Sequence, residues 1–300
     1  MHSNIENLNK SPIRFKDTEK LLDLRYDNVF KAVFTRDTPA SKRALSGLIS
    51  ALIGRKITVD IIIANEPPVN SVFDHCIRFD IACKTESGEL VNIEMSSNPD
   101  SCEPVRLEYH AARQFSGQGI RGVDKGYADL VETFQITVLC KYKYFADKAL
   151  VHTFQYYDPV RNVSLGGKTR VITLELSKVE QIIDKSTDDM DASEKWSVFF
   201  EYLTKEEKRG KINELLEKED EIAMAGETLM HISQDEIEFA RLTSELKYEL
   251  DNQSHRVNAR REGLAEGRAE GRAEGQKEAK KHFMELLNQG LSIEEIKQRL

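Results

Sequence analysis

The order of apolar and polar positions predicts two helices early in the chain, followed by a group of β-strands. Residues 21–34 and 41–54 carry apolar side chains at helical spacing, and a short polar loop separates the two segments. Residues 57–66, 73–84 and 89–97 are rich in β-branched side chains and partly alternate between apolar and polar positions, as strands do. This succession of helices and strands indicates an α/β fold.

A third helix and further strands continue the pattern. Pro104 suits the first turn of a helix, and the segment that it opens runs to a glycine-rich exit near residue 118. Residues 134–140, 151–158 and 170–176 again have the composition of strands. The expected architecture is therefore a central mixed β-sheet flanked by helices and followed by a helical C-terminal region.

Changes in composition divide the chain into four expected parts. Residues 1–20 are polar and are predicted to be a disordered leader, and residues 21–180 form the α/β core. Residues 181–258 are acidic, contain no strand-like run and are predicted to be helical, so a domain boundary is expected near residue 180. Residues 259–300 contain a Gly/Glu/Arg repeat that is either a helix or a linker, followed by short terminal helices.

The repeat EGLAEGRAEGRAEGQ has a glycine at every fourth position from Gly263 to Gly275. Like charges also recur every four residues, and each interior glycine costs about 1 kcal/mol, so an isolated helix here is expected to be marginal. Close packing of small residues between two chains would make it a homo-oligomeric contact, and a flexible linker is the alternative. Further on, Ser292 and Glu295 have the spacing of a capping box that opens a final short helix.

Charge and composition restrict the class of protein only weakly. The chain has 43 basic and 51 acidic residues, a net charge of −8, and therefore no overall basic footprint for nucleic acid. Many of the acidic residues lie beyond residue 180, which leaves room for a neutral or basic face on the first half. The four cysteines form no C-x-x-C pair, and the chain shows neither a secretory signal nor an apolar run of about 18 residues. These features predict a cytoplasmic protein without membrane partners.

The candidate chemistry lies on a predicted β-hairpin formed by residues 76–83 and 90–97. A loop of Glu86, Ser87 and Gly88 closes it, with the glycine at the position that favours a left-handed conformation. In this register one face is apolar and the other is polar, and a slip of one residue would bury charges. The apolar face pairs Phe79 with Met95, Ile81 with Ile93 and Cys83 with Val91; the polar face pairs Arg78 with Ser96, Asp80 with Glu94 and Ala82 with Asn92.

Asp80 and Glu94 are thus predicted to face each other across the hairpin, with Cβ atoms about 5 Å apart. Such like charges destabilise a sheet unless a cation compensates them, and Mg²⁺ or Mn²⁺ would use these oxygen ligands. The alternative is a solvated sheet face neutralised by Arg78. Arg106, His110 and Arg113 form one stripe of the following helix, which favours phosphate chemistry beside the acidic pair over a solvated helix face.

Four segments carry a resemblance to a known family: DNVFKAVF at 27–34, RFDIACKTESGELVNIEMS at 78–96, VRLEYH at 105–110 and KYKYF at 141–145. They resemble the recombination-promoting nuclease (Rpn) family of the PD-(D/E)XK nuclease superfamily. The resemblance implies a restriction-endonuclease-like core and metal-dependent cleavage of DNA, associated with recombination or transposition.

The resemblance also implies roles for individual residues. Asp80 and Glu94 would be metal ligands, the backbone carbonyl of Met95 would add a third oxygen, and Asp27 is a minor candidate near the metal. Ser96 stands where the superfamily has lysine and this family usually has glutamine. The missing positive charge would then come from Arg106 or Arg113 on the helix, or from a nearby base such as Lys84. The alternative function is a weakened core that binds DNA or a protein without cutting, or that serves as a scaffold assembled through its C-terminal half.

Overall fold

The computed structural model describes residues 13–63, 80–97, 101–120, 126–141 and 143–288. By density of contacts these residues fall into two compact units, one that extends to Leu242 and one that begins at Thr243. Within the described residues, no helix is both long enough and apolar enough to cross a membrane.

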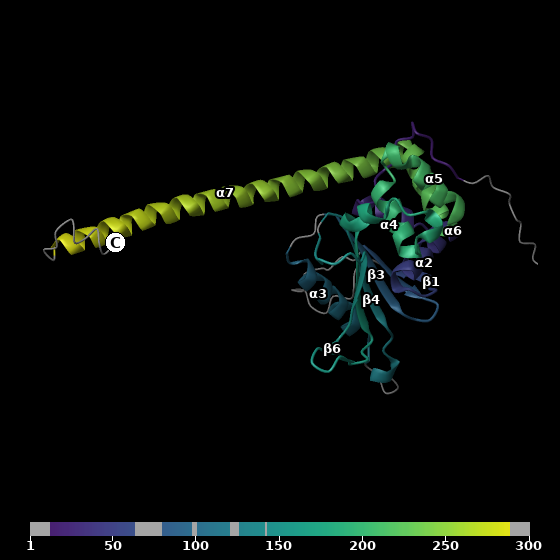
Figure 1. Ribbon diagram of the computed structural model, residues 1–300, viewed down its shortest axis with the longest axis horizontal. Helices are drawn as coiled ribbons and strands as arrows, with labels where there is room; N and C mark the ends of the chain where they lie inside the picture. The colour runs from purple at the N-terminus through teal and green to yellow at the C-terminus, as the bar shows by residue number, and fades with distance from the viewer. Residues whose placement is uncertain (1–12, 64–79, 98–100, 121–125, 142, 289–300) are drawn as a thin grey trace, which may run out of the picture. The chain divides into compact units, whose positions relative to one another are not determined.

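A six-stranded mixed sheet forms the centre of the first unit (Figure 1). Its spatial order is β1-β2-β3-β4-β8-β5, where β3, β4 and β8 are parallel and the other neighbours are antiparallel. The bounds of the strands are β1 Val59–Ile63, β2 Ile81–Thr85, β3 Leu90–Ser96, β4 Thr133–Leu139, β5 Val151–Phe154 and β8 Thr169–Glu175. A separate hairpin pairs β6 (Tyr157–Asp158) with β7 (Val163–Ser164). The sheet flanked by helices confirms the predicted α/β architecture.

The register of β2 and β3 agrees with the prediction over the described residues. Ile81 pairs with Ile93, Ala82 with Asn92 and Cys83 with Val91. Gly88 has φ of +91°, the left-handed conformation expected at the end of the three-residue loop. The predicted pairs formed by Arg78 and Phe79 lie outside the described residues.

The two faces of the sheet are covered by different helices. The aliphatic face packs against α1 (Asp27–Phe34) and α2 (Pro39–Ile53), and its central side chains, such as Ile93 and Ile136, are fully buried. The opposite face carries buried polar side chains and is covered by α3 (Glu103–Ser116), which connects β3 to β4 (Figure 1). Because strands alternate their side chains, this polar layer collects Asn92, Glu94, Ser96, Gln135 and Thr137.

The sheet ends at Glu175, but the compact unit continues to Leu242, so the boundary lies there rather than near residue 180. Helices α4 (Ala192–Tyr202), α5 (Arg209–Lys218) and α6 (Asp220–Gln234) belong to the first unit. The physical reason is a shared aromatic core: Phe34 of α1 contacts Trp196 and Phe200 of α4, with ring centroids 6.0 and 6.5 Å apart. Helix α6 packs along α2.

The prediction of a disordered leader over residues 1–20 is wrong for its described part. Phe15 is 2% exposed, and its backbone N–H and C=O bind the Asn213 side chain at 2.8 and 3.0 Å. Phe15 also lies against Gly226 of α6, where a larger residue would meet the ring. Tertiary packing on α5 and α6 therefore orders a segment whose own sequence is polar. Residues 1–12 lie outside the described residues.

The second unit contains most of helix α7 (Glu236–Asn288), which runs through the glycine repeat. The repeat is exposed on all sides, and a Cβ atom added at Gly263, Gly267, Gly271 or Gly275 would meet no other atom. The capping box at Ser292 and Glu295 lies outside the described residues.

Candidate active site

Two carboxylates lie on the polar face of the sheet where β2 and β3 run side by side. Glu94 is in the middle of β3, and Asp80 directly precedes β2. The Asp80 carboxylate accepts a hydrogen bond from the backbone N–H of Met95 at 2.9 Å. The side chain of Asp80 is 17% exposed and that of Glu94 is 3% exposed. The structure therefore brings together the two carboxylates that the hairpin register predicted to be opposed.

Three side chains bind the Glu94 carboxylate. Its Oε1 accepts hydrogen bonds from His110 Nδ1 at 2.6 Å and from Asn92 Nδ2 at 2.8 Å, and Arg106 lies 3.3 Å from its Oε2. Burial alone would raise the pKa of Glu94, but the hydrogen bond from His110 and the charges of His110 and Arg106 outweigh it and lower the pKa. Glu94 is thus held as an anion in a buried position. Asn92 extends the polar layer to Gln135 of β4 at 2.7 Å.

Asp80 has the opposite electrostatic environment. Burial is the largest cause that raises its pKa to about 7, and the negative charges of Asp27 and Glu94 raise it further. Lys31 and the Met95 amide act in the other direction but do not restore the ordinary value. The site therefore holds an excess of negative charge, which is the condition under which a cation stabilises the fold.

Helix α1 brings two further charged groups to the site. Lys31 Nζ lies 2.8 Å from Asp27 Oδ2 and 3.2 Å from Asp80 Oδ1. From sequence, Asp27 was a minor candidate near the metal, and no role was predicted for Lys31. A signal was present, because Asp27 and Lys31 are a polar pair at i and i+4 on a helix whose Val29, Phe30, Val33 and Phe34 are all buried.

The residues near the carboxylates differ in whether they can supply the positive charge that Ser96 lacks. Ser96 follows Glu94 by two residues on β3, is 8% exposed and supplies no positive charge. Lys84 is exposed and lies four residues from Asp80, about 13 Å along the strand. Lys31 is the lysine that reaches the carboxylates, although it comes from another element of the fold.

Helix α3 contributes the basic stripe that the sequence predicted. Arg106 binds both Glu103 and Glu94, and His110 binds Glu94. Arg113 lies seven residues further along α3, about 10 Å from Arg106 parallel to the helix axis. Arg106 and His110 thus line the carboxylate pair directly, whereas Arg113 lies toward the C-terminal end of α3.

The donor atoms at this site suit a hard divalent cation. Two buried carboxylate oxygens, Glu94 Oε2 and Asp27 Oδ1, accept no hydrogen bond. Over the described residues, no group of three or more His, Cys, Asp and Glu side chains has the arrangement of a complete metal site. Mg²⁺ often takes only one or two protein carboxylates and completes its shell with water and substrate oxygens, so these residues fit such an ion.

Comparison with known proteins agrees with the fold. A family model described as PD-(D/E)XK nuclease family transposase matches residues 24–259. A search of curated proteins and a search of solved structures found no match. The matched region contains the whole sheet, α3 and the residues around Asp80 and Glu94.

Proposed function

Because this chain belongs to the PD-(D/E)XK nuclease family transposases, we propose that it is a metal-dependent DNA endonuclease that acts in recombination or transposition. The observation that supports this proposal most strongly is the buried pair of Asp80 and Glu94, with basic side chains on two sides. A buried acidic pair without a cation is unstable, and a phosphodiester also needs positive charge near its oxygens.

Asp80 and Glu94 would hold Mg²⁺ or Mn²⁺, and the backbone carbonyl of Met95 would add an oxygen. The ion, when bound, supplies charge neutralisation at the phosphate and lowers the pKa of a coordinated water. Asp27 is a further oxygen donor close to Asp80, because its Oδ1 accepts no hydrogen bond.

Lys31 takes the electrostatic role of the lysine that Ser96 replaces. Its ammonium group already lies 3.2 Å from Asp80, so it can orient a water at that carboxylate and donate a hydrogen bond to a phosphate oxygen. Arg106 holds Glu94 on the other side and presents its guanidinium from α3, where it can steady the phosphate. Arg113 and the Ser96 hydroxyl are secondary candidates for contacts with the substrate.

A plasmid-nicking assay with Mg²⁺ or Mn²⁺ tests the proposal. Intact protein is expected to nick, and Asp80→Asn and Glu94→Gln are expected to lose nicking by at least about 100-fold. Asp60→Asn is the matched control, because Asp60 is an exposed carboxylate on β1 of the same sheet and lies outside the site. Equal nicking by Asp80→Asn and the intact protein would exclude the carboxylate site.

A second candidate function is DNA binding without cleavage. It is favoured by Ser96 and by the engagement of Arg106 with two glutamates, Glu103 and Glu94, which leaves less of the guanidinium for phosphate. Oligonucleotide binding that persists while no metal supports nicking would identify this function.

A further inference from the structure

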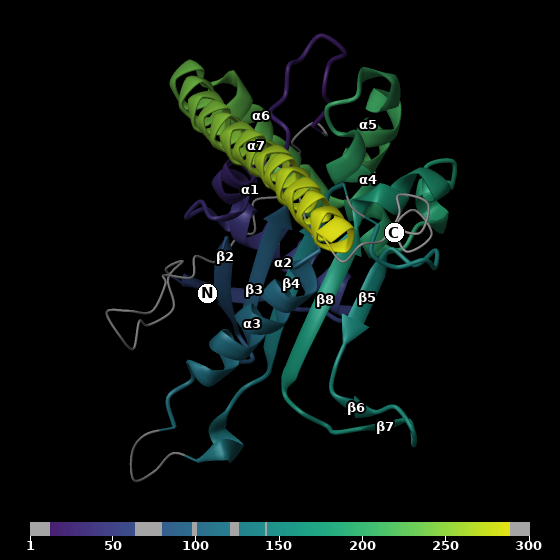
Figure 2. The same ribbon diagram turned by 90° about the vertical axis from the view of Figure 1, so that its left-hand side faces the viewer.

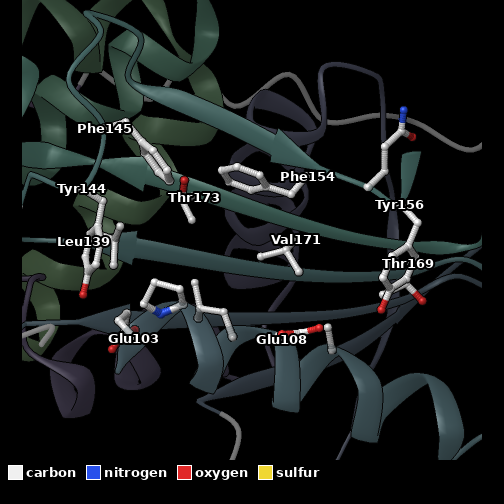
Figure 3. A pocket seen from close by; sticks show the side chains of 14 residues that line it. Glu103, Glu108, Leu139, Tyr144, Phe145, Phe154, Tyr156, Thr169, Val171 and Thr173 are labelled. Atoms are coloured by element: carbon white, nitrogen blue, oxygen red, sulfur yellow. The ribbon is translucent and has the colours of Figure 1, made fainter. Parts of the chain in front are cut away.

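An apolar cleft of about 300 Å³ lies between α3 and strands β8 and β5 (Figure 3). It is on the same face of the sheet as Glu94, because Thr173 in its lining pairs with Thr137, which pairs with Glu94. Aromatic rings form much of its wall: Tyr144 and Phe145 follow β4, Phe154 ends β5, and Tyr156 follows it. Val171 and Thr173 of β8 line the cleft as well, and α3 closes the opposite side. The proposed hydrolysis uses none of these residues.

The aromatic wall is held in place by a buried ion pair. The Glu175 carboxylate accepts hydrogen bonds from the backbone N–H groups of Tyr144 and Phe145, and Lys178 binds the same carboxylate. The Phe145 ring lies 4.3 Å from the His152 ring and 5.3 Å from the Phe154 ring, measured between centroids. The rings are therefore positioned before any ligand arrives, as is usual for binding pockets.

The cleft is close to the carboxylate pair. Glu94 pairs with Thr137 across β3 and β4, and Thr137 pairs with Thr173 across β4 and β8. Two strand spacings of about 4.8 Å each separate Glu94 from Thr173, which gives about 10 Å. Glu103 links the cleft to the carboxylate pair. It lines the cleft and binds Arg106, which contacts Glu94. If one nucleotide of a DNA strand lies at the carboxylates, its neighbour in the strand would reach the cleft.

Exposed basic residues accompany the aromatic wall. Lys143 directly precedes Tyr144, Lys141 lies three positions before it, and both lysines are exposed. Basic side chains interleaved with aromatic rings are the pattern by which proteins bind single-stranded nucleic acid, because the charges follow the backbone and the rings stack on the bases. On the opposite wall, Glu108 offers a carboxylate that can accept a hydrogen bond from an exocyclic amino group.

We infer that this cleft binds one unstacked nucleobase of the DNA strand whose phosphodiester lies at Asp80 and Glu94. The inference rests on the proposed function and adds a substrate class to it: DNA with an unpaired or extruded base. A cavity of about 300 Å³ is at the small end of ligand pockets, large enough for a single base and too small for a base pair with its backbone. The Glu108 carboxylate favours cytosine, adenine and guanine over thymine, because thymine is the one DNA base without an exocyclic amino group.

Fluorescence anisotropy of a short labelled single-stranded oligonucleotide, measured with the full chain in EDTA, tests the inference without any cleavage. The intact protein is expected to bind this oligonucleotide roughly 5- to 100-fold more tightly than one of equal length that is abasic throughout, since base stacking on aromatic rings has this magnitude. Phe154→Ala and Tyr156→Ala are expected to remove most of that difference and to leave binding of the abasic strand unchanged.

Tyr157→Ala is the matched control, because Tyr157 is 54% exposed, adjacent to Tyr156 at 57%, and does not line the cleft. It is expected to bind both strands as the intact protein does. Equal binding of the two strands by the intact protein would overturn the inference, and so would an unchanged preference in Phe154→Ala and Tyr156→Ala. The latter result would point to another occupant, such as an apolar side chain of a peptide.

The outcomes of this test and of the nicking assay are separate. Base-dependent binding without nicking would refute the endonuclease and retain the base pocket. Nicking with no contribution from Phe154 or Tyr156 would retain the endonuclease and refute the pocket.

Discussion

Replacing Asp80 by asparagine is expected to stabilise the metal-free protein at alkaline pH. The pKa of Asp80 is raised to about 7, mainly by burial and then by the negative charges of Asp27 and Glu94. The ordinary value is about 3.9, and each pH unit of difference corresponds to about 1.4 kcal/mol, so ionised Asp80 costs the fold at most about 4 kcal/mol. Asparagine is nearly isosteric and can still accept the hydrogen bond from the Met95 amide.

The net gain will be smaller than this upper limit, because the Asp80 side chain is 17% exposed and water partly screens its charge. We expect a net stabilisation of about 1–3 kcal/mol at pH 8. For a compact unit of this size, about 1 kcal/mol corresponds to roughly 2–4 °C, so the midpoint should rise by roughly 2–12 °C.

The sign of the pH dependence follows from the raised pKa. A carboxyl group whose pKa is higher in the folded state contributes its full stability below the unfolded pKa, near 4, and loses it as pH rises through 7. The intact protein should therefore lose stability relative to Asp80→Asn across this window, and the difference should disappear at about pH 4.

Thermal unfolding followed by circular dichroism in EDTA, at several pH values between 4 and 8.5, measures this difference, with Asp60→Asn as the control for loss of an ordinary exposed carboxylate. Adding Mg²⁺ at pH 8 should raise the midpoint of the intact protein and have much less effect on Asp80→Asn, because only the native site binds the ion. A variant that is less stable than the intact protein at pH 8, or a difference that grows toward acid, would refute the electrostatic reasoning.

Three further predictions concern other parts of the molecule. Lys31→Gln should reduce plasmid nicking by about 100-fold or more while Lys84→Gln nicks normally, and equal effects of the two changes would show that proximity to Asp80 is irrelevant. Phe15→Ala should lower the free energy of unfolding by about 3–5 kcal/mol in urea, because the ring is buried against α6; a change below about 1 kcal/mol would mean that the segment is not part of the core. Deleting residues 259–300 should lower the number of chains per particle, calculated from the mass measured by light scattering, as expected for a homo-oligomer that uses the repeat, and leave the nicking rate intact; an unchanged number of chains would exclude the repeat as the contact.

The β-hairpin shows how much local pattern can determine. Alternation of apolar and polar residues along 76–97 separates an apolar face from a polar face in one register only, and that register by itself predicted the opposition of Asp80 and Glu94. The stripe of Arg106 and His110 could likewise be predicted from sequence, because the prediction requires only the periodicity of one helix and the direct connection of that helix to β3.

Contacts between segments distant in sequence were decided only by the tertiary structure. Lys31 reaches Asp80 because α1 packs against β3, and no local pattern relates a residue on the first helix to a strand some fifty positions later. Phe15 is ordered by α5 and α6. The acidic helices that the sequence analysis placed in a separate region include α4, whose Trp196 and Phe200 share an aromatic core with Phe34 of α1. Figure 2 shows α4, α5 and α6 beyond the end of the sheet.

The aromatic cleft has the same origin. Tyr144, Phe154 and Thr173 come from different segments, and the cleft exists only because the parallel and antiparallel neighbours of β8 bring those segments together beneath α3. Sequence periodicity determines which face of an element a side chain occupies. Which elements then become neighbours depends on burying those faces together, and that is a property of the whole fold.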